Sequence, residues 1–136
     1  MAPDQAVSLT IAPAAWSGDA EELLRKANEG AALADVREQV QAGTARLFML
    51  AEHDNAAPCG AFVLRVDQTA AGPQGVIVSA AGHREGVSLI DAVLPHIEGL
   101  FQGVRSIRLH TGNPALARRL AARGYAPAEI VSVKHL

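Results

Sequence analysis

Two apolar runs joined by a short turn constrain the fold of this chain more than any other feature. The runs are Ala45–His53 and Gly60–Asp67, and the turn Asp54–Pro58 lies between them. The first run is almost continuously apolar, as in a strand that is covered on both faces, and the second alternates apolar side chains onto one face. A short polar turn between two such runs brings neighbouring strands together. The sequence therefore predicts an antiparallel hairpin.

The segment before this hairpin predicts one strand and two helices. A short strand is expected at Ser8–Ala12, where apolar residues alternate weakly. A helix follows over Asp19–Gly30, with Asp19 as its capping residue and Gly30 as its stop. Apolar residues at helical spacing predict a second helix over Leu33–Ala42, which ends at the glycine that follows.

The segment after the hairpin alternates between strands and helices. Pro95 lies inside the first of its helices and should kink or shorten it, because proline removes one backbone donor and crowds the preceding turn. The complete order is strand, helix, helix, three strands, helix, strand, helix, strand, which is typical of a mixed sheet with helices on its faces. The predicted elements are a strand at Gly75–Ala80, a helix over 90–101, a strand at Ser106–His110, a helix from Asn113 to Gly124 and a strand at 129–136.

Composition excludes several classes of protein. The 136 residues are 49% hydrophobic and 19% charged, which predicts one globular domain over residues 1–136. No apolar run approaches the about 18 residues that span a membrane, and a net charge of −2 argues against nucleic acid as a partner. A single cysteine, Cys59, excludes an internal disulfide and a cysteine-based zinc cluster. The start of the chain lacks the basic region of a signal peptide, so a cytoplasmic location is expected.

Charge is unevenly distributed between the two halves. Residues 1–74 carry five Lys and Arg against ten Asp and Glu, a balance of −5, whereas residues 75–136 carry seven against four, a balance of +3. An anionic ligand would therefore be expected on the C-terminal half. The alternative is an ordinary imbalance of surface charge.

The stretch His83–Ser88 interrupts the pattern between a predicted strand and the helix that follows it. A turn into a helix N-terminus presents unpaired N–H groups and the positive end of the helix dipole to an anion. Gly86 would let the backbone approach a phosphate, and Arg84 could add a charge-assisted contact. Glu85 would repel a phosphate, although it also favours a helix N-terminus. The alternative is a capped helix start that binds nothing.

The order of elements and the residues from Gly75 onward resemble the GNAT superfamily of acyl-CoA-dependent N-acetyltransferases. Family members carry Gln/Arg-x-x-Gly-x-Gly/Ala at the exit of the fourth strand, and His83–Ser88 stands in that register with Gly86 at the central glycine. They also carry an asparagine followed, at the interval found here between Asn113 and Gly124, by a glycine and an aromatic residue. Where the family often has a tyrosine that assists the departing thiolate, this chain has Leu120.

The resemblance implies a GNAT-like α/β fold, with a mixed, mostly antiparallel sheet of about six strands and helices on both faces. It implies acetyl-CoA as a co-substrate, an amine as the acceptor, and transfer of an acetyl or related acyl group to a primary amine. The alternative is a GNAT-fold protein that binds a CoA-like ligand or a protein partner with little or no catalysis; a homodimer also stays open. The cofactor-binding residues implied are Ile77, Val78, His83, Arg84, Glu85, Gly86, Val87, Ser88 and Asn113.

The acid–base residues are less well defined by the sequence. Glu52, with His53 beside it, ends the second predicted strand, and His110 ends the fifth; each is a candidate for proton transfer. The alternative for all three is a polar residue that caps a strand. The five histidines show no close ligand spacing, so no metal site is expected. Tyr125 is expected to pack as the aromatic residue of the family does.

Overall fold

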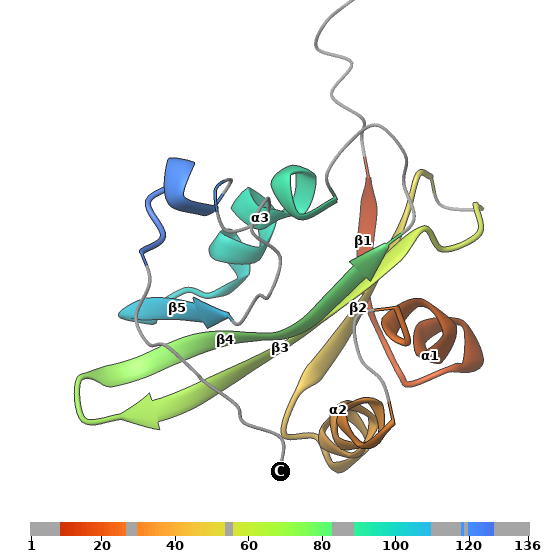
Figure 1. Ribbon diagram of the computed structural model, residues 1–136, viewed down its shortest axis with the longest axis horizontal. Helices are drawn as coiled ribbons and strands as arrows, with labels where there is room; N and C mark the ends of the chain where they lie inside the picture. Colours follow the sequence, from red (N-terminus) through yellow and green to blue (C-terminus); the bar gives the residue numbers. More distant parts are fainter. Residues whose placement is uncertain are drawn as a thin grey trace, which may run out of the picture.

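The fold is built around one five-stranded sheet (Figure 1). The computed structural model describes residues 9–26, 30–53, 56–82, 89–109, 118 and 120–126, with the backbone alone for 89–92. The strands follow one another across the sheet in chain order, from β1 to β5. Their bounds are Thr10–Ala14 (β1), Arg46–Ala51 (β2), Gly60–Thr69 (β3), Gly72–Gly82 (β4) and Ser106–Leu109 (β5); the helices are Gly18–Leu24 (α1), Ala31–Ala42 (α2) and Leu89–Leu100 (α3).

Strand directions make the sheet mixed and mostly antiparallel, as predicted. The pairings β1–β2, β2–β3 and β3–β4 are antiparallel, whereas β4 and β5 run parallel and are joined through α3. The expected hairpin is the β2–β3 pair, with Phe48 opposite Phe62 and their rings stacked at 5.0 Å. The sixth predicted strand, at 129–136, lies outside the described residues.

Each face of the sheet carries its own core, and the helices divide between the faces in the same way (Figure 1). One face is covered by α3, and the other by α1 and α2. The helices lie on both faces because successive strand side chains alternate in direction, so one apolar strand feeds two cores. The α3 face buries Phe48, Leu50, Phe62, Leu64, Ile77, Val93, Leu94, Ile97, Phe101 and Leu120; the α1/α2 face buries Ala20, Leu23, Leu24, Leu33, Val36, Ala45, Leu47, Ala61 and Val63.

The caps of the first two helices differ from the prediction in two respects. Ser17, not Asp19, caps α1: its hydroxyl accepts a hydrogen bond from the Ala20 N–H at 3.2 Å, and Asp19 lies in the first turn, where its charge favours the helix dipole. Gly30 does not end α1; it precedes α2 as that helix's N-cap, with a φ of 54°. The predicted stop of α2 at Gly43 is confirmed, with a left-handed φ of 81°.

Pro95 does not end α3, so of the two expected effects, a kink or a shortening, the shortening does not occur. The helix continues to Leu100, and Pro95 is exposed on it. A proline in mid-helix costs one backbone hydrogen bond. Val93, Leu94 and Ile97 are buried on the same helix, and this apolar contact with the sheet compensates for the missing bond.

Candidate functional site

A β-bulge interrupts the pairing of β3 with β4 at Val78. Val63 lies opposite Ser79, and the next pair is Leu64 with Ile77, so Val78 is an extra residue on β4. An extra residue bends its strand and increases the local twist, and such bulges are frequent beside active sites. The bulge therefore redirects the last part of β4, from Val78 to Gly82.

Beyond the bulge, β4 ends in a free backbone edge over Ala80–Gly82. Parallel pairing with β5 ends at Ile77 and Leu109, whereas β4 continues to Gly82. Among the described residues, no strand pairs with Ala80–Gly82 on the side of β5. Strand N–H and C=O groups on such an edge are available to a ligand with amide groups of its own. β4 and β5 therefore stop pairing before β4 ends, and the end of β4 can hydrogen-bond a ligand through its backbone.

The free edge leads toward the N-terminus of α3. β4 ends at Gly82 and α3 begins at Leu89, so the predicted phosphate-binding turn is the connection between them. Ile77 is buried in the core of the α3 face, and Val78 is half-buried and packs against the core of the other face. The other predicted cofactor residues and one catalytic candidate lie outside the described residues: His83, Arg84, Glu85, Gly86, Val87, Ser88, Asn113 and His110.

Glu52 and His53 are exposed and follow the end of β2. β2 and β4 run in the same direction because both are antiparallel to β3, and Leu50, Gly60 and Gly82 lie in one row across the sheet. Glu52 therefore lies at the same end of the sheet as the free edge of β4, about 10 Å away across two strand spacings. A general base acts at hydrogen-bond distance or through one water, and about 10 Å exceeds both, so Glu52 could act only on a group held between it and β4.

Leu120 lies in the apolar core of the α3 face and is only 5% exposed. Its side chain carries no acidic proton, so this position provides no acid for a leaving thiolate. The helical residues around it pack on the sheet through this leucine. Leucine therefore suits this position, where the family often has a tyrosine, because the surroundings are those of an apolar core.

Tyr125 packs against the same core, in agreement with the prediction, and also makes a specific polar contact. Its hydroxyl donates a hydrogen bond to the Glu98 Oε2 atom of α3 at 2.7 Å, and its N–H bonds the Leu120 carbonyl at 3.0 Å. Burial, and then the Glu98 carboxylate, raise the pKa of Tyr125. The phenol therefore stays protonated at neutral pH and links α3 to the residues after Leu120.

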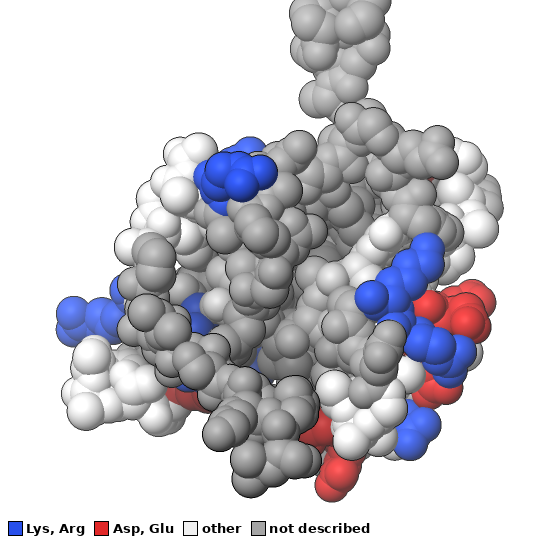
Figure 2. All heavy atoms as spheres, in the orientation of Figure 1, with Lys and Arg blue, Asp and Glu red and all other residues white. Residues whose placement is uncertain are grey.

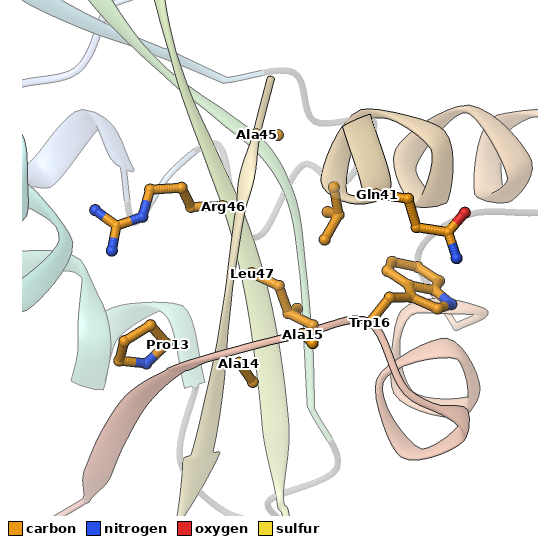
Figure 3. A pocket seen from close by; sticks show the side chains of 9 residues that line it. Pro13, Ala14, Ala15, Trp16, Gln41, Ala45, Arg46 and Leu47 are labelled. Carbon is orange, nitrogen blue, oxygen red and sulfur yellow. The ribbon is translucent and has the colours of Figure 1, made fainter. Parts of the chain in front are cut away.

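A pocket of about 400 Å³ opens on the α1/α2 side, beside the end of β1 (Figure 3). Trp16 forms one wall, and its Nε1 atom donates a hydrogen bond to Glu21, which also accepts from Arg37 of α2. None of its lining residues is a carboxylate, a thiol or an imidazole, so the pocket itself offers no group for general acid–base catalysis. It is lined by Pro13, Ala14, Ala15, Trp16, Val40, Gln41, Ala45, Arg46 and Leu47.

Surface charge differs between the two halves of the chain, as the sequence indicates. Figure 2 shows acidic and basic side chains side by side over the α1–α2 part of the molecule, whereas the described surface at the upper left shows basic groups alone. Ion pairs account for the first pattern, since Glu21 and Glu22 both bond Arg25 within 3.2 Å. Exposed Arg118 and Arg123 lie in the C-terminal part of the described chain. These observations agree with a preference for anions on the C-terminal half.

Known structures share this arrangement of strands and helices. An acetyltransferase from Trypanosoma brucei superposes with a TM-score of 0.70 over 95% of this chain and all of its own, at 16% identity. A GCN5-related N-acetyltransferase from Ralstonia eutropha gives 0.63 over 94% and 99%, at 18% identity. The chain has the GNAT fold. AAC(6′)-Iy in complex with the bisubstrate analog CoA-S-monomethyl-acetylneamine gives 0.67 over 95% and 98%, at 14% identity. No family model and no curated protein matches the sequence itself.

Two features of the site are absent from the sequence pattern. The bulge at Val78 lies inside an apolar run whose pattern does not indicate its pairing register. No local pattern marks Trp16 as the wall of a pocket. Ser79 is a usable signal for the first, because it is a buried hydroxyl within the apolar run from Val76 to Ala81. Within the described ranges, no three His, Cys, Asp or Glu side chains gather to hold a metal, and no helix is long and apolar enough to cross a membrane.

Proposed function

We propose that this protein transfers an acetyl or related acyl group from acyl-CoA to a primary amine. The free edge of β4 after the bulge at Val78 is the observation that carries the proposal. The pantetheine arm of CoA contains amide groups, which can pair with a strand backbone from Ala80 to Gly82. The chain shares its fold with acetyltransferases, and one of them was solved with an analog that joins CoA to an amine.

In this proposal each part of the site has a separate task. The turn His83–Ser88, at the start of α3, and Asn113 hold the CoA portion, with the pyrophosphate at the helix N-terminus. A backbone N–H at Ile77 or Val78 polarises the thioester carbonyl. All of these residues lie within the single domain proposed for residues 1–136.

The reaction needs two proton movements. A bond forms between the amine nitrogen and the carbonyl carbon, the carbon–sulfur bond breaks, the nitrogen loses one proton and the thiolate gains one. Glu52, through a water, or His110 accepts the proton from nitrogen in this proposal. Because Leu120 cannot donate, the thiolate takes its proton from water or from another group.

Binding and turnover can be measured separately. Isothermal titration with CoA should show saturable heat, and release of free thiol from acetyl-CoA should depend on the added amine. If CoA binds but acetyl-CoA releases no thiol with any amine in a panel of primary amines and amino acids, the result would support the non-catalytic alternative. Titration without heat at millimolar CoA would contradict both.

A glycine pair tests the position of the CoA site. Gly86→Val should weaken CoA binding strongly, because a branched side chain blocks the approach of a phosphate to the backbone. Gly18→Val is the matched control: Gly18 begins α1, and a Cβ there meets nothing within 4 Å. Equal CoA affinity in the parent and in Gly86→Val would remove the turn from the site.

A further inference from the structure

Three charged side chains gather on the α1/α2 face of the sheet, just before the bulge in β4. Arg65 of β3, Val76 of β4 and Arg108 of β5 lie in one row across the sheet. Arg65 reaches α2 on this face, because its Nη1 atom donates a hydrogen bond to the Gln39 Oε1 atom at 2.7 Å. Asp67 lies two residues after Arg65 and therefore on the same face. Arg65, Asp67 and Arg108 are called the charged cluster below.

The first arginine of the charged cluster is fully occupied by its neighbours. The Nε and Nη2 atoms of Arg65 donate to the two oxygens of Asp67, at 2.7 and 3.0 Å, and its Nη1 atom is bound to Gln39. A guanidinium and a carboxylate that meet through two parallel hydrogen bonds form a strong and geometrically specific pair. Arg65 therefore balances the charge of Asp67.

Arg108, by contrast, keeps most of its hydrogen-bonding capacity. Its Nη2 atom lies 3.5 Å from the Asp67 Oδ2 atom, at the limit of a hydrogen bond. Its Nε atom is buried without a partner, the one such side-chain atom in the described part of the chain. Its Nη1 atom also has no partner there but is not buried, so it reaches solvent. Two arginines against one aspartate leave a net charge of +1, and Arg108 is the surplus cation.

The surplus cation suits a carboxylate ligand. A polar atom that is buried without a partner is unfavourable within the protein alone, which is typical of side chains that serve a ligand. The planar guanidinium matches the geometry of a carboxylate. One carboxylate brings the charge of the cluster to zero, whereas a phosphate monoester, with nearly two negative charges at neutral pH, exceeds it.

Arg108 also lies close to the point at which the proposed reaction takes place. It stands opposite Val76, two residues before the bulge at Val78. One strand spacing and two residues along β4 separate the Cα atoms of Arg108 and Val78 by about 8 Å. Val78 packs on the same face of the sheet as the charged cluster. A ligand with its amine near Val78 and a carboxylate several bonds away would therefore reach both.

We propose that the acceptor is a primary amine that also carries a carboxylate, and that Arg108 binds this carboxylate. The proposal rests on the proposed acetyl transfer and adds the class of acceptor to it. The solvent-facing Nη1 atom of Arg108 is the point of contact, and the bidentate pair of Arg65 with Asp67 fixes the surface beside it. The amine then points toward the backbone at Val78.

Matched acceptors test the substrate class. Thiol release from acetyl-CoA is measured with ω-amino acids of increasing chain length, each compared with its uncharged amide. The best acid should have a KM about tenfold to hundredfold lower than its amide, which is the range of one hydrogen bond between charged groups. Equal kcat/KM values for acids and amides would overturn the proposal. A preference for aminoalkyl phosphates of the same length would overturn the assignment of a carboxylate.

Substitutions at Arg108 test whether it is the binding residue. Arg108→Gln should raise the KM of the amino acid by about tenfold or more, with kcat, the KM of the amide and the dissociation constant of CoA unchanged. Arg108→Lys should lie between, because an ammonium keeps the charge but lacks the planar fork. Arg46→Gln is the matched control, because Arg46 is exposed and lies over Phe48, on the other face of the sheet. An equal rise of KM for the acid and the amide would contradict the proposal.

Binding measured without turnover separates this proposal from acetyl transfer itself. Calorimetric titration of the amino acid, with and without CoA, should show heat that Arg108→Gln loses and Arg46→Gln keeps, even if no thiol is released. Turnover of amines without a preference for acids would overturn the acceptor class and leave acetyl transfer in place. No heat with any amino acid would overturn the site. Thermal melting establishes that Arg108→Gln folds; if it does not, Arg108→Lys and the comparison of acids with amides decide.

Discussion

Gly75 of β4 packs closely against the ring of Phe101, the residue that follows α3. A Cβ on Gly75 would lie 2.8 Å from two atoms of the Phe101 ring, so the ring would have to move. Gly75→Ala should therefore lower the free energy of unfolding by about 1–3 kcal/mol, as overpacking does in cores. Urea denaturation followed by circular dichroism measures this change.

Gly99 supplies the opposite case in the same part of the fold. It lies within α3, and an added Cβ would meet nothing within 4 Å. Gly99→Ala should raise the free energy of unfolding by about 0.5–1 kcal/mol, because alanine favours the helix. Equal effects of Gly75→Ala and Gly99→Ala would show that Phe101 moves aside without cost.

Asp67 gives the stability of the protein a dependence on acid pH. The hydrogen bonds from Arg65 hold the pKa of the Asp67 carboxyl below its ordinary value of 3.8, and nearby Arg108 adds to the effect. A carboxyl with a lowered pKa in the folded state stabilises the protein above the ordinary pKa, and this contribution is lost as pH falls through the lowered value. Asp67→Asn should therefore cost about 1 kcal/mol at neutral pH.

The cost of Asp67→Asn should disappear in acid. Unfolding of the parent and of the variant in urea, at micromolar protein and between neutral pH and pH values well below 3.8, measures the difference between them. Asp19→Asn, in the first turn of α1, controls for the general loss of one negative charge. A difference that persists unchanged below the ordinary pKa would show that the Arg65 contact does not depend on the charge of Asp67.

At the scale of elements, order was predictable from the sequence and register was not. Apolar runs and turn residues locate β2, β3 and α2, because burial periodicity and glycine conformation are local properties. The bulge at Val78 depends on how β4 lies against β3, which no local pattern records. The start of β4 at Gly72, rather than Gly75, likewise depends on pairing across the turn, where Gly72 adopts a φ of 112°.

Leu120 stands where the family often has a tyrosine that acts as an acid, and its side chain packs in the core of the α3 face. Leu120→Tyr should lower the free energy of unfolding by about 1–3 kcal/mol, because a larger side chain with a hydroxyl enters an apolar core. A positioned acid is typically worth about 10²–10⁴-fold in rate, so the same change should raise thiol release if the hydroxyl reaches the thiolate. Chemical denaturation and the thiol assay measure the two effects.

Ala121→Tyr is the matched control, because Ala121 is exposed and adjacent on the same helix. It should change neither stability nor thiol release. Parent turnover that already equals that of efficient acetyltransferases would show that the acid is supplied elsewhere, and His110→Ala would then be the variant to measure.

At the scale of the whole molecule, the two proposed substrates differ in how far the sequence can place their binding sites. A nucleotide phosphate calls for a glycine turn at a helix N-terminus, which is a local pattern, and His83–Ser88 could be singled out for that reason. An amine acceptor is recognised by side chains from several loops, and these come together only in the folded chain. The pocket beside Trp16 shows the same limit, because β1, β2 and α2 all contribute to it.

CoA binding should stabilise the whole fold by mass action. At a CoA concentration 100 times its dissociation constant, the free energy of unfolding should rise by about 2.7 kcal/mol, since the ligand binds the folded chain alone. For 136 residues this corresponds to an increase in melting temperature of roughly 9 °C. Differential scanning calorimetry over a CoA series measures the increase, which should grow with the logarithm of concentration. Val66→Lys should show the same increase as the parent, because Val66 lies opposite Gly75, apart from the end of β4 at Gly82. A melting temperature that does not change at millimolar CoA would refute the CoA site.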